Sequence, residues 1–190
     1  MLKQITTLAL IATVGVLGQT GTVQADKHDK HHEHHEHMAH TEGAVVLRPT
    51  KGNKVRGRLS LKQTKDGVRV TGRVINLSPG EHGFHIHEYG DLRDPQGKAA
   101  GGHYNPKGHQ HGGPDSKESH AGDLGNITAN DDGVAKVNIL AKGLKLHFVL
   151  GRSFVVHGGQ DDLSSQPSGD AGPRVAVGVI GIAQPKMKKK

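Results

Sequence analysis

The sequence predicts an all-β protein built as a β-sandwich or a Greek-key barrel. Three observations support this prediction. Glycine makes up 28 of the 190 residues, without the three-residue period of collagen. Apolar residues are only 33% of the chain and aromatic residues 3%, which leaves little material for a large helical core. The apolar residues also lie in short β-branched runs separated by glycine turns, as in sandwiches and barrels.

The first 25 residues have the features of a secretory signal peptide. Lys3 gives a positive start, residues 5–17 form a short apolar run, and small residues up to Ala25 offer a cleavage site. The apolar run is too short to cross a bilayer, so we expect no membrane span. The mature chain is then expected to begin near Asp26 and to be secreted, either to the periplasm or outside the cell.

Residues 26–42 form a low-complexity segment that is rich in histidine and poor in apolar residues, so we expect a disordered tail. Its seven histidines are His28, His31, His32, His34, His35, His37 and His40. Imidazoles interspersed with Glu can gather copper or zinc ions. A solvated tail with incidental metal affinity is the alternative, and the pattern does not decide between them.

The net charge of +7 comes partly from a second tail, the lysine-rich residues 185–190. Basic residues and aromatic residues are not interleaved along the chain, so no nucleic-acid partner is expected. A solubilising basic surface is the simpler interpretation of the charge.

The β pattern begins at Gly43 and continues to the end of the domain. Expected strands cover residues 44–47, 54–61, 68–75, 83–88, 133–139, 152–156 and 175–182. Between them, residues 89–119 carry almost no strand signal. A structureless segment of that length in a compact domain needs something to order it.

Histidine is the residue type that carries chemistry in this chain. Cysteine is absent, which excludes disulfides, thiolate metal sites, iron–sulfur clusters and a cysteine nucleophile. A transition metal would therefore bind imidazole and carboxylate, a donor set suited to Cu(II) and Zn(II). On the strand expected over residues 83–88, His85 and His87 share one face while Phe84 and Ile86 point to the core. Taken alone, this pair is also compatible with two surface histidines.

Six segments together are far more specific: GFHIHEYGD, GGHYNP, HGGP, HAGDLGN, VVHGGQDDL and AGPRVAVGVIG. In order and spacing they resemble the copper/zinc superoxide dismutase family over residues 43–184. The resemblance implies one domain, an eight-stranded Greek-key β-barrel (an immunoglobulin-like sandwich) with two long functional loops. It also implies an enzyme that converts superoxide to dioxygen and hydrogen peroxide, which in a secreted protein would protect the cell envelope.

The same resemblance implies a role for each member of the site. The copper ligands would be His85, His87, His103 and His157. The zinc ligands would be His103, His111, His120 and Asp123, with His103 bridging both ions and carrying a proton during turnover. Asp161 would hydrogen-bond His85 and His111, and Arg174 would hold superoxide beside the copper. Zinc binding would also order the long loop. The remaining histidines of the domain, His82, His109 and His147, are expected to be ordinary surface or local residues.

Two departures from the family pattern are visible. The family usually has a disulfide between the zinc loop and the last strand, whereas Val177 stands at the strand position of the second cysteine. Such a bond contributes about 2–4 kcal/mol, so we expect metal binding to carry more of the stability here. The loop over residues 158–173 is short and carries three Asp but no Lys. Steering of superoxide would then depend on lysines elsewhere, such as Lys98 and Lys107.

Other functions and assemblies are left open by the sequence. A non-catalytic protein that stores or delivers copper and zinc is favoured by the histidine-rich tail, and the tail of an enzyme could also pass metal to its site. A zinc hydrolase is disfavoured, because four protein ligands leave no position for water. The chain could act as a monomer or as a homodimer.

Overall fold

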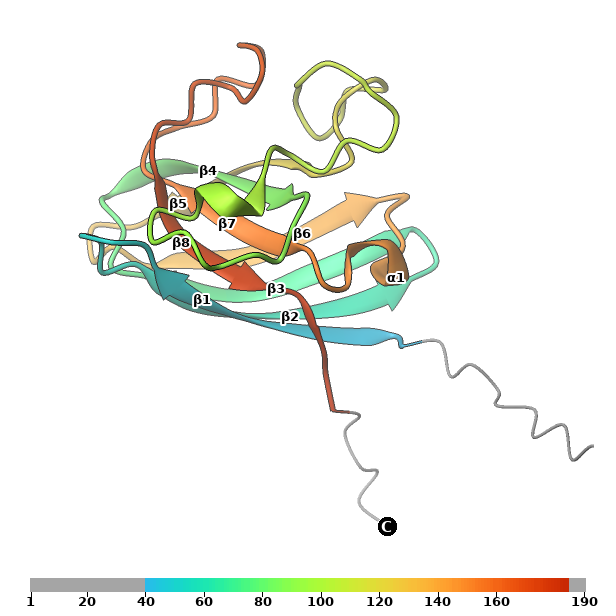
Figure 1. Cartoon of the computed structure of the whole chain (residues 1–190), viewed down its shortest axis with the longest axis horizontal. Coiled ribbons are helices and arrows are strands. Elements are labelled where there is room, and N and C mark those ends of the chain that lie inside the picture. Colours follow the sequence, from blue (N-terminus) through green and yellow to red (C-terminus); the bar gives the residue numbers. More distant parts are fainter. Residues whose placement is uncertain (1–39, 185–190) are drawn as a thin grey trace, which may run out of the picture. The chain divides into compact units, whose positions relative to one another are not determined.

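Eight antiparallel strands close into a barrel within residues 40–184, the part of the chain that this computed structural model describes (Figure 1). The strands are β1 (Glu42–Pro49), β2 (Arg56–Thr64), β3 (Gly67–Ile75), β4 (Gly80–His87), β5 (Asp123–Ala129), β6 (Ala135–Lys142), β7 (Ser153–His157) and β8 (Arg174–Val179). Their spatial order is β2-β3-β6-β5-β4-β7-β8-β1, and β1 also pairs with β2, which closes the barrel. The expected eight-stranded barrel is thus confirmed, with a short extra strand, β9 (Gly181–Ile182), beside β1.

The core follows from the alternation of side chains along each strand. In β2, Leu59 and Leu61 are buried between exposed neighbours, and the same period continues in β3. On β4, Phe84 and Ile86 join this core as expected, and Phe84 stacks on Phe154 of β7 with ring centroids 4.9 Å apart. Aliphatic side chains with one pair of stacked rings therefore fill a barrel that contains few aromatic residues.

The structure differs from the sequence prediction at two strands. The strand β5 was not expected, because its sequence DLGNITA contains only two large aliphatic residues and has a glycine inside it. In the structure this glycine, Gly125, has a positive φ of 72°. The run expected over residues 175–182 is divided into β8 and β9. Ile180 lies between them, where its N–H donates to the carbonyl of Arg152 instead of to a neighbouring strand.

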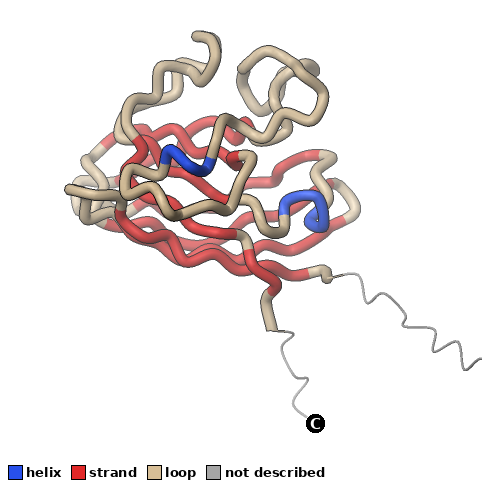
Figure 2. Tube along the Cα trace, in the orientation of Figure 1, coloured by secondary structure: helices blue, strands red, loops and turns tan. Residues whose placement is uncertain are grey.

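Two long connections leave opposite ends of the antiparallel pair β4 and β7, and both lie on the same side of the barrel (Figure 2). One joins β4 to β5 and contains the short 3₁₀ helix η1 (Lys98–Ala100); the other joins β7 to β8. These are the two long loops implied by the resemblance. The remaining helix, α1 (Leu146–Val149), is a single turn before β7. No helix among the described residues is long and apolar enough to cross a membrane.

Three predicted features lie wholly or mostly outside the described residues. They are the signal peptide over residues 1–25, the histidine-rich tail over residues 26–42, of which only residues 40–42 are described, and the basic tail over residues 185–190.

Candidate metal centre

The strands and the long loops bring every predicted ligand to the outer side of the barrel at β4 and β7. His85 and His87 lie on β4, His157 is the last residue of β7, and Asp123 is the first residue of β5. His103 pairs with His87 through an isolated β-bridge, which holds the middle of the first long loop against β4. Backbone hydrogen bonds on both sides of the bridge, from Glu88 to Gly102 and from Tyr104 to Ile86, fix this position.

The ligands form two groups that share one ring. The nitrogen atoms of the first group lie within 4.8 Å of one another and belong to His85, His87, His103 and His157. The same limit holds for the second group, which consists of His103, His111, His120 and Asp123. Since His103 belongs to both groups, its two ring nitrogens serve two adjoining sites.

One nitrogen of each copper-side ring is occupied by a hydrogen bond, which fixes the tautomer. Nδ1 of His87 donates to the carbonyl of Gly101 at 2.9 Å, and Nδ1 of His157 donates to the carbonyl of Gly172 at 3.0 Å. Because a carbonyl oxygen only accepts, these nitrogens carry the protons and leave Nε2 of each ring with a free lone pair.

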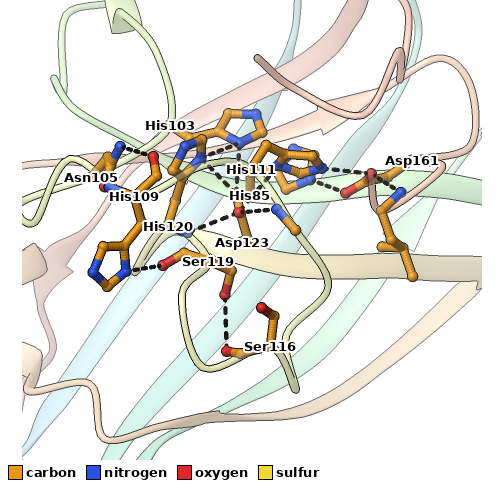
Figure 3. Close-up of polar contacts among 12 residues, drawn as sticks. His85, His103, Asn105, His109, His111, Ser116, Ser119, His120, Asp123 and Asp161 are labelled. Carbon is orange, nitrogen blue, oxygen red and sulfur yellow. Dashed lines mark hydrogen bonds and ion pairs between the residues drawn. The ribbon is translucent and has the colours of Figure 1, made fainter. Parts of the chain in front are cut away.

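Asp161 fixes two further rings in the same way. Its two carboxylate oxygens accept from Nε2 of His85 at 2.7 Å and from Nε2 of His111 at 2.9 Å (Figure 3). Burial would raise the pKa of Asp161, but the hydrogen bonds from His85, from the Leu163 N–H and from His111 lower it to about 2. The carboxylate is therefore ionised and acts only as an acceptor, so both rings keep Nδ1 free to bind a metal.

Five buried ring nitrogens of the described residues have no hydrogen-bond partner. They are Nδ1 of His85 and His111, and Nε2 of His87, His103 and His157. A buried polar atom without a partner is costly unless something else satisfies it, and here all five belong to the two groups. The orphaned atoms face the shared centre, so the residues present fit two metal ions.

Burial lowers the pKa of three copper-side rings, those of His85, His87 and His157, and keeps them neutral. It lowers the pKa of His85 from 6.5 to about 4 and that of His157 to about 3, and it holds the pKa of His87 well below 6.5. A neutral imidazole offers the lone pair that a metal needs, so at neutral pH these rings are ready to bind copper without first losing a proton.

Asp123 organises the zinc side. Its Oδ1 lies 2.7 Å from Nδ1 of His103 and 3.1 Å from Nδ1 of His120, and its Oδ2 lies 3.1 Å from Nδ1 of His111 (Figure 3). Oδ2 also accepts from the backbone N–H groups of Gly112 and His120. Three imidazoles and one carboxylate in this arrangement are the donor set of a closed tetrahedral zinc site.

A hollow of 510 Å³ opens onto the copper side and is lined by His87, His103, His157 and Arg174. The guanidinium of Arg174 donates to the carbonyls of Gly97 at 2.5 Å and Gly101 at 2.6 Å, so it holds the first long loop as well as lining the hollow. An arginine remains charged when half-buried, and it can bind a small anion there.

Several contacts at the site were not found from the sequence. Gln166 pairs with both the N–H and the carbonyl of His111, at 2.8 and 3.0 Å, and Asn126 pairs in the same way with Asp161. Carboxamide side chains are common in loops, so no sequence signal distinguishes these two. His82 was expected to be an ordinary surface or local histidine, but it is buried, and its Nδ1 lies 2.9 Å from the carbonyl oxygen of His157. His109 is half-buried and lies outside both groups, and His147 is exposed.

An antiparallel barrel with two metal sites joined through one imidazole defines a binuclear metalloprotein. A family model described as copper/zinc superoxide dismutase matches residues 55–180. The chain is 45% identical over 140 residues to superoxide dismutase [Cu-Zn] 2 of Mesembryanthemum crystallinum, which covers 68% of this chain and 89% of that protein. The crystal structure of the clock protein EA4 is similar with a TM-score of 0.72 and 37% identity, covering 79% of this chain and 99% of that chain.

The chain therefore belongs to the copper/zinc superoxide dismutase family. It is accordingly an oxidoreductase with copper and zinc as cofactors, as the sequence implied.

Proposed function

We propose that this chain disproportionates superoxide to dioxygen and hydrogen peroxide, with copper on His85, His87, His103 and His157 and zinc on His103, His111, His120 and Asp123. The observation that carries this proposal is the sharing of His103 between two four-residue ligand groups. A storage protein needs binding sites, but it does not need a ring that joins two of them beside an arginine-lined opening. The shared ring therefore favours catalysis over storage.

Copper supplies the one-electron oxidation and reduction of superoxide when it is bound. The chain's own residues perform the other tasks. Arg174 binds the anion in the hollow, where its guanidinium can hydrogen-bond both oxygen atoms. Nε2 of His103 is buried, has no hydrogen-bond partner and lies among the residues that line this hollow. When this nitrogen does not hold copper, it can carry one of the two protons that hydrogen peroxide requires, and water in the hollow would supply the other. The zinc side holds His103 through Nδ1, next to Asp123.

Replacement of one copper ligand tests the assignment. We expect His157→Ala and His87→Ala to lose copper and superoxide turnover while they retain zinc, because neither ring belongs to the zinc group. His147→Ala is the control, since this exposed residue lies in the single-turn helix α1. Metal analysis and a superoxide-decay assay measure the two effects. Full turnover in either ligand variant would contradict the proposal.

We further propose that the enzyme acts outside the cytoplasm and protects the cell envelope from superoxide. The support is the predicted signal peptide over residues 1–25, which lies outside the described residues. Sequencing of the N-terminus of the exported protein tests this, and we expect it to start near Asp26. An uncleaved chain retained in the cytoplasm would contradict it.

The histidine-rich segment supports a second role in gathering metal for the site. Residues 26–42 contain seven histidines and end at Glu42, the first residue of β1. We expect deletion of this segment to lower metal loading when copper or zinc is limiting, but to leave the turnover of fully loaded enzyme unchanged. Equal loading of both proteins at limiting metal would contradict this role.

A further inference from the structure

The positive charge of the barrel is concentrated in one segment of the chain. Residues 48–73 contain nine Lys or Arg residues and a single acid, Asp66. This segment runs from the end of β1 through β3. The remaining described residues contain more acids than bases. The net charge is therefore unevenly distributed over the fold.

The cations of this segment point outward from the barrel. In β1, β2, β3 and β6 the inward positions are aliphatic residues or glycine apart from Gln63 near the end of β2, and we name the outward surface of these four strands the basic face. Its cations are Arg48, Arg56, Arg58, Lys62, Arg69, Arg73, Lys136 and Lys142. Among the outward positions of these described strands one acid is present, Glu42, which is opposite Lys62 at the edge of the face. Val46, with 58% of its surface exposed, lies opposite Arg58 and adds an apolar side chain.

The register places like charges directly opposite one another. Arg58 faces Arg73, Arg73 faces Lys136, and Lys62 faces Arg69. Like charges in such cross-strand pairs destabilise a sheet. Lys142 pairs with Asp115 at 2.7 Å, and within residues 40–184 no salt bridge connects the other seven cations to an acid. The folded protein therefore carries a repulsion that bound anions would relieve.

The basic face lies away from the metal centre. The copper-side histidines are on β4, on β7 and in the first long loop, while β2 and β3 lie on the opposite side of the closed strand order (Figure 1). The hollow beside Arg174 does not include any cation of the basic face. Charge on this face therefore does not line the substrate's entrance, and a large partner bound there would leave the metal centre open to solvent.

We propose that the basic face docks the protein onto an anionic phospholipid surface. Arg48, Arg56, Arg58 and Arg73 surround an open hollow of 950 Å³, and guanidinium groups bind phosphate in a bidentate manner. A sheet face with dense positive charge and the exposed apolar Val46 matches a layer of anionic headgroups above acyl chains.

Two other partners fit the basic face less well. The five aromatic residues of the chain, Phe84, Tyr89, Tyr104, Phe148 and Phe154, all lie outside β1, β2, β3 and β6, so the face offers no platform for nucleic-acid bases. A second copy of the chain would bring like charges together.

Vesicle binding by the metal-loaded protein tests the proposal. We expect the protein to sediment with vesicles of phosphatidylcholine and phosphatidylglycerol, but not with phosphatidylcholine alone. It should be released when salt shortens the Debye length from about 10 Å to about 3 Å. Arg58→Gln/Arg73→Gln should bind about thirtyfold more weakly, because each basic side chain near an anionic surface contributes on the order of a factor of five.

A matched control separates the face from the net charge. Lys117→Gln/Lys145→Gln removes the same charge from two exposed residues outside the basic face, and all variants keep identical tails. We expect this control to bind like the parent protein, and we expect superoxide turnover to persist while the enzyme is vesicle-bound. The arginine variant should melt no lower than the parent, since it loses a repulsion.

Four results would overturn the proposal. The first is that the protein does not bind the anionic vesicles, and the second is that the control variant loses as much binding as the arginine variant. The third is that superoxide turnover is lost when the enzyme is bound to vesicles. The fourth is that a single-stranded oligonucleotide or a sulfated polysaccharide binds more tightly than the vesicles and depends on the same arginines.

Discussion

At the scale of single residues, each ring's orientation is set by the hydrogen bond on the nitrogen that faces away from the metal. Asp161 performs this task for His85 and His111 with a single carboxylate, so one side chain connects the copper side to the zinc side. The backbone around Asp161 is fitted closely to it. Gly169 has a φ of 68°, and a Cβ at this position would lie 1.8 Å from Oδ1 of Asp161. Only glycine fits there.

Replacing Asp161 with asparagine should weaken metal binding. The amide NH₂ would face a ring N–H that now donates to a carboxylate, so one of the two rings loses its partner. Changes of this kind typically cost 10- to 100-fold in affinity, and we expect about that loss for zinc. Competition with a zinc chelator measures it, with the exposed neighbour variant Asp162→Asn as control. Equal zinc affinity in the two variants would show that Asp161 does not orient the rings.

The lowered pKa values predict how the metal-free protein responds to acid. In the folded protein the pKa of His85 is about 4 and that of His157 is about 3, so both rings stay neutral at higher pH. Histidines in the unfolded chain take up protons below about pH 6.5. The unfolded state then binds more protons, so the free energy of unfolding falls as pH decreases from about 6.5 to about 4. The pKa of Asp161, lowered to about 2, adds an effect of the same sign below about 4.

Denaturant unfolding of the metal-free protein at a series of pH values measures this dependence. A stability that does not change between pH 7 and pH 4.5 would mean that the rings are not buried as neutral groups.

At the scale of elements, the two long loops are held together without a disulfide. Ala100, Val155 and Val177 form a small buried apolar cluster beside the first loop, and Arg174 ties that loop through the carbonyls of Gly97 and Gly101. Gln166 then joins the second loop to His111 of the first loop by two hydrogen bonds. Apolar packing at Val177 and these hydrogen bonds thus hold the loops in the region where the family usually has its disulfide.

Removal of the Gln166 contact should loosen the zinc side. Each hydrogen bond contributes about 0.5–1.5 kcal/mol, so we expect Gln166→Ala to release zinc about tenfold faster than the parent protein. Release into a colorimetric chelator gives the rate, and Gln160→Ala is the control, because this exposed side chain bonds only to Glu81. An unchanged rate would show that the two loops are ordered independently of this side chain.

Sequence pattern and structure agree best where a residue's neighbours along the chain determine its position. The alternation in β4 correctly separated Phe84 and Ile86 from His85 and His87, since successive side chains of a strand point to opposite faces of the sheet. The strand β5 was missed because it is held by pairing with β4, which its own sequence does not reveal. Gln166 could not be identified for a similar reason, since its partner His111 is 55 positions away. Of the site itself, the resemblance supplied the ligands, whereas their hydrogen bonds required the structure.

At the scale of the whole molecule, the metal ions should carry much of the stability. Five buried ring nitrogens without partners are a cost that metal binding removes, and there is no disulfide to compensate in the metal-free chain. Ligand present at a thousand times its dissociation constant stabilises a fold by about 4 kcal/mol, so we expect chelation to lower the melting temperature by on the order of 10 °C. Differential scanning calorimetry before and after chelation decides this, and equal melting temperatures would contradict it.

The division of tasks over the barrel follows from its closed strand order. The outer side of β4 and β7 carries the two metal sites and the hollow beside Arg174, while the outward surface of β1, β2, β3 and β6 carries the basic face. The chemistry of the site and the proposed docking to an anionic surface can therefore be altered separately by mutation.

The central claim is that residues far apart in the chain form one bridged copper/zinc centre that disproportionates superoxide. Pulse radiolysis on protein of measured copper and zinc content tests it most directly. We predict that the rate of superoxide decay rises in proportion to bound copper, with zinc present, and falls to the uncatalysed rate when copper is removed. Superoxide decay that does not depend on the copper content would contradict the account.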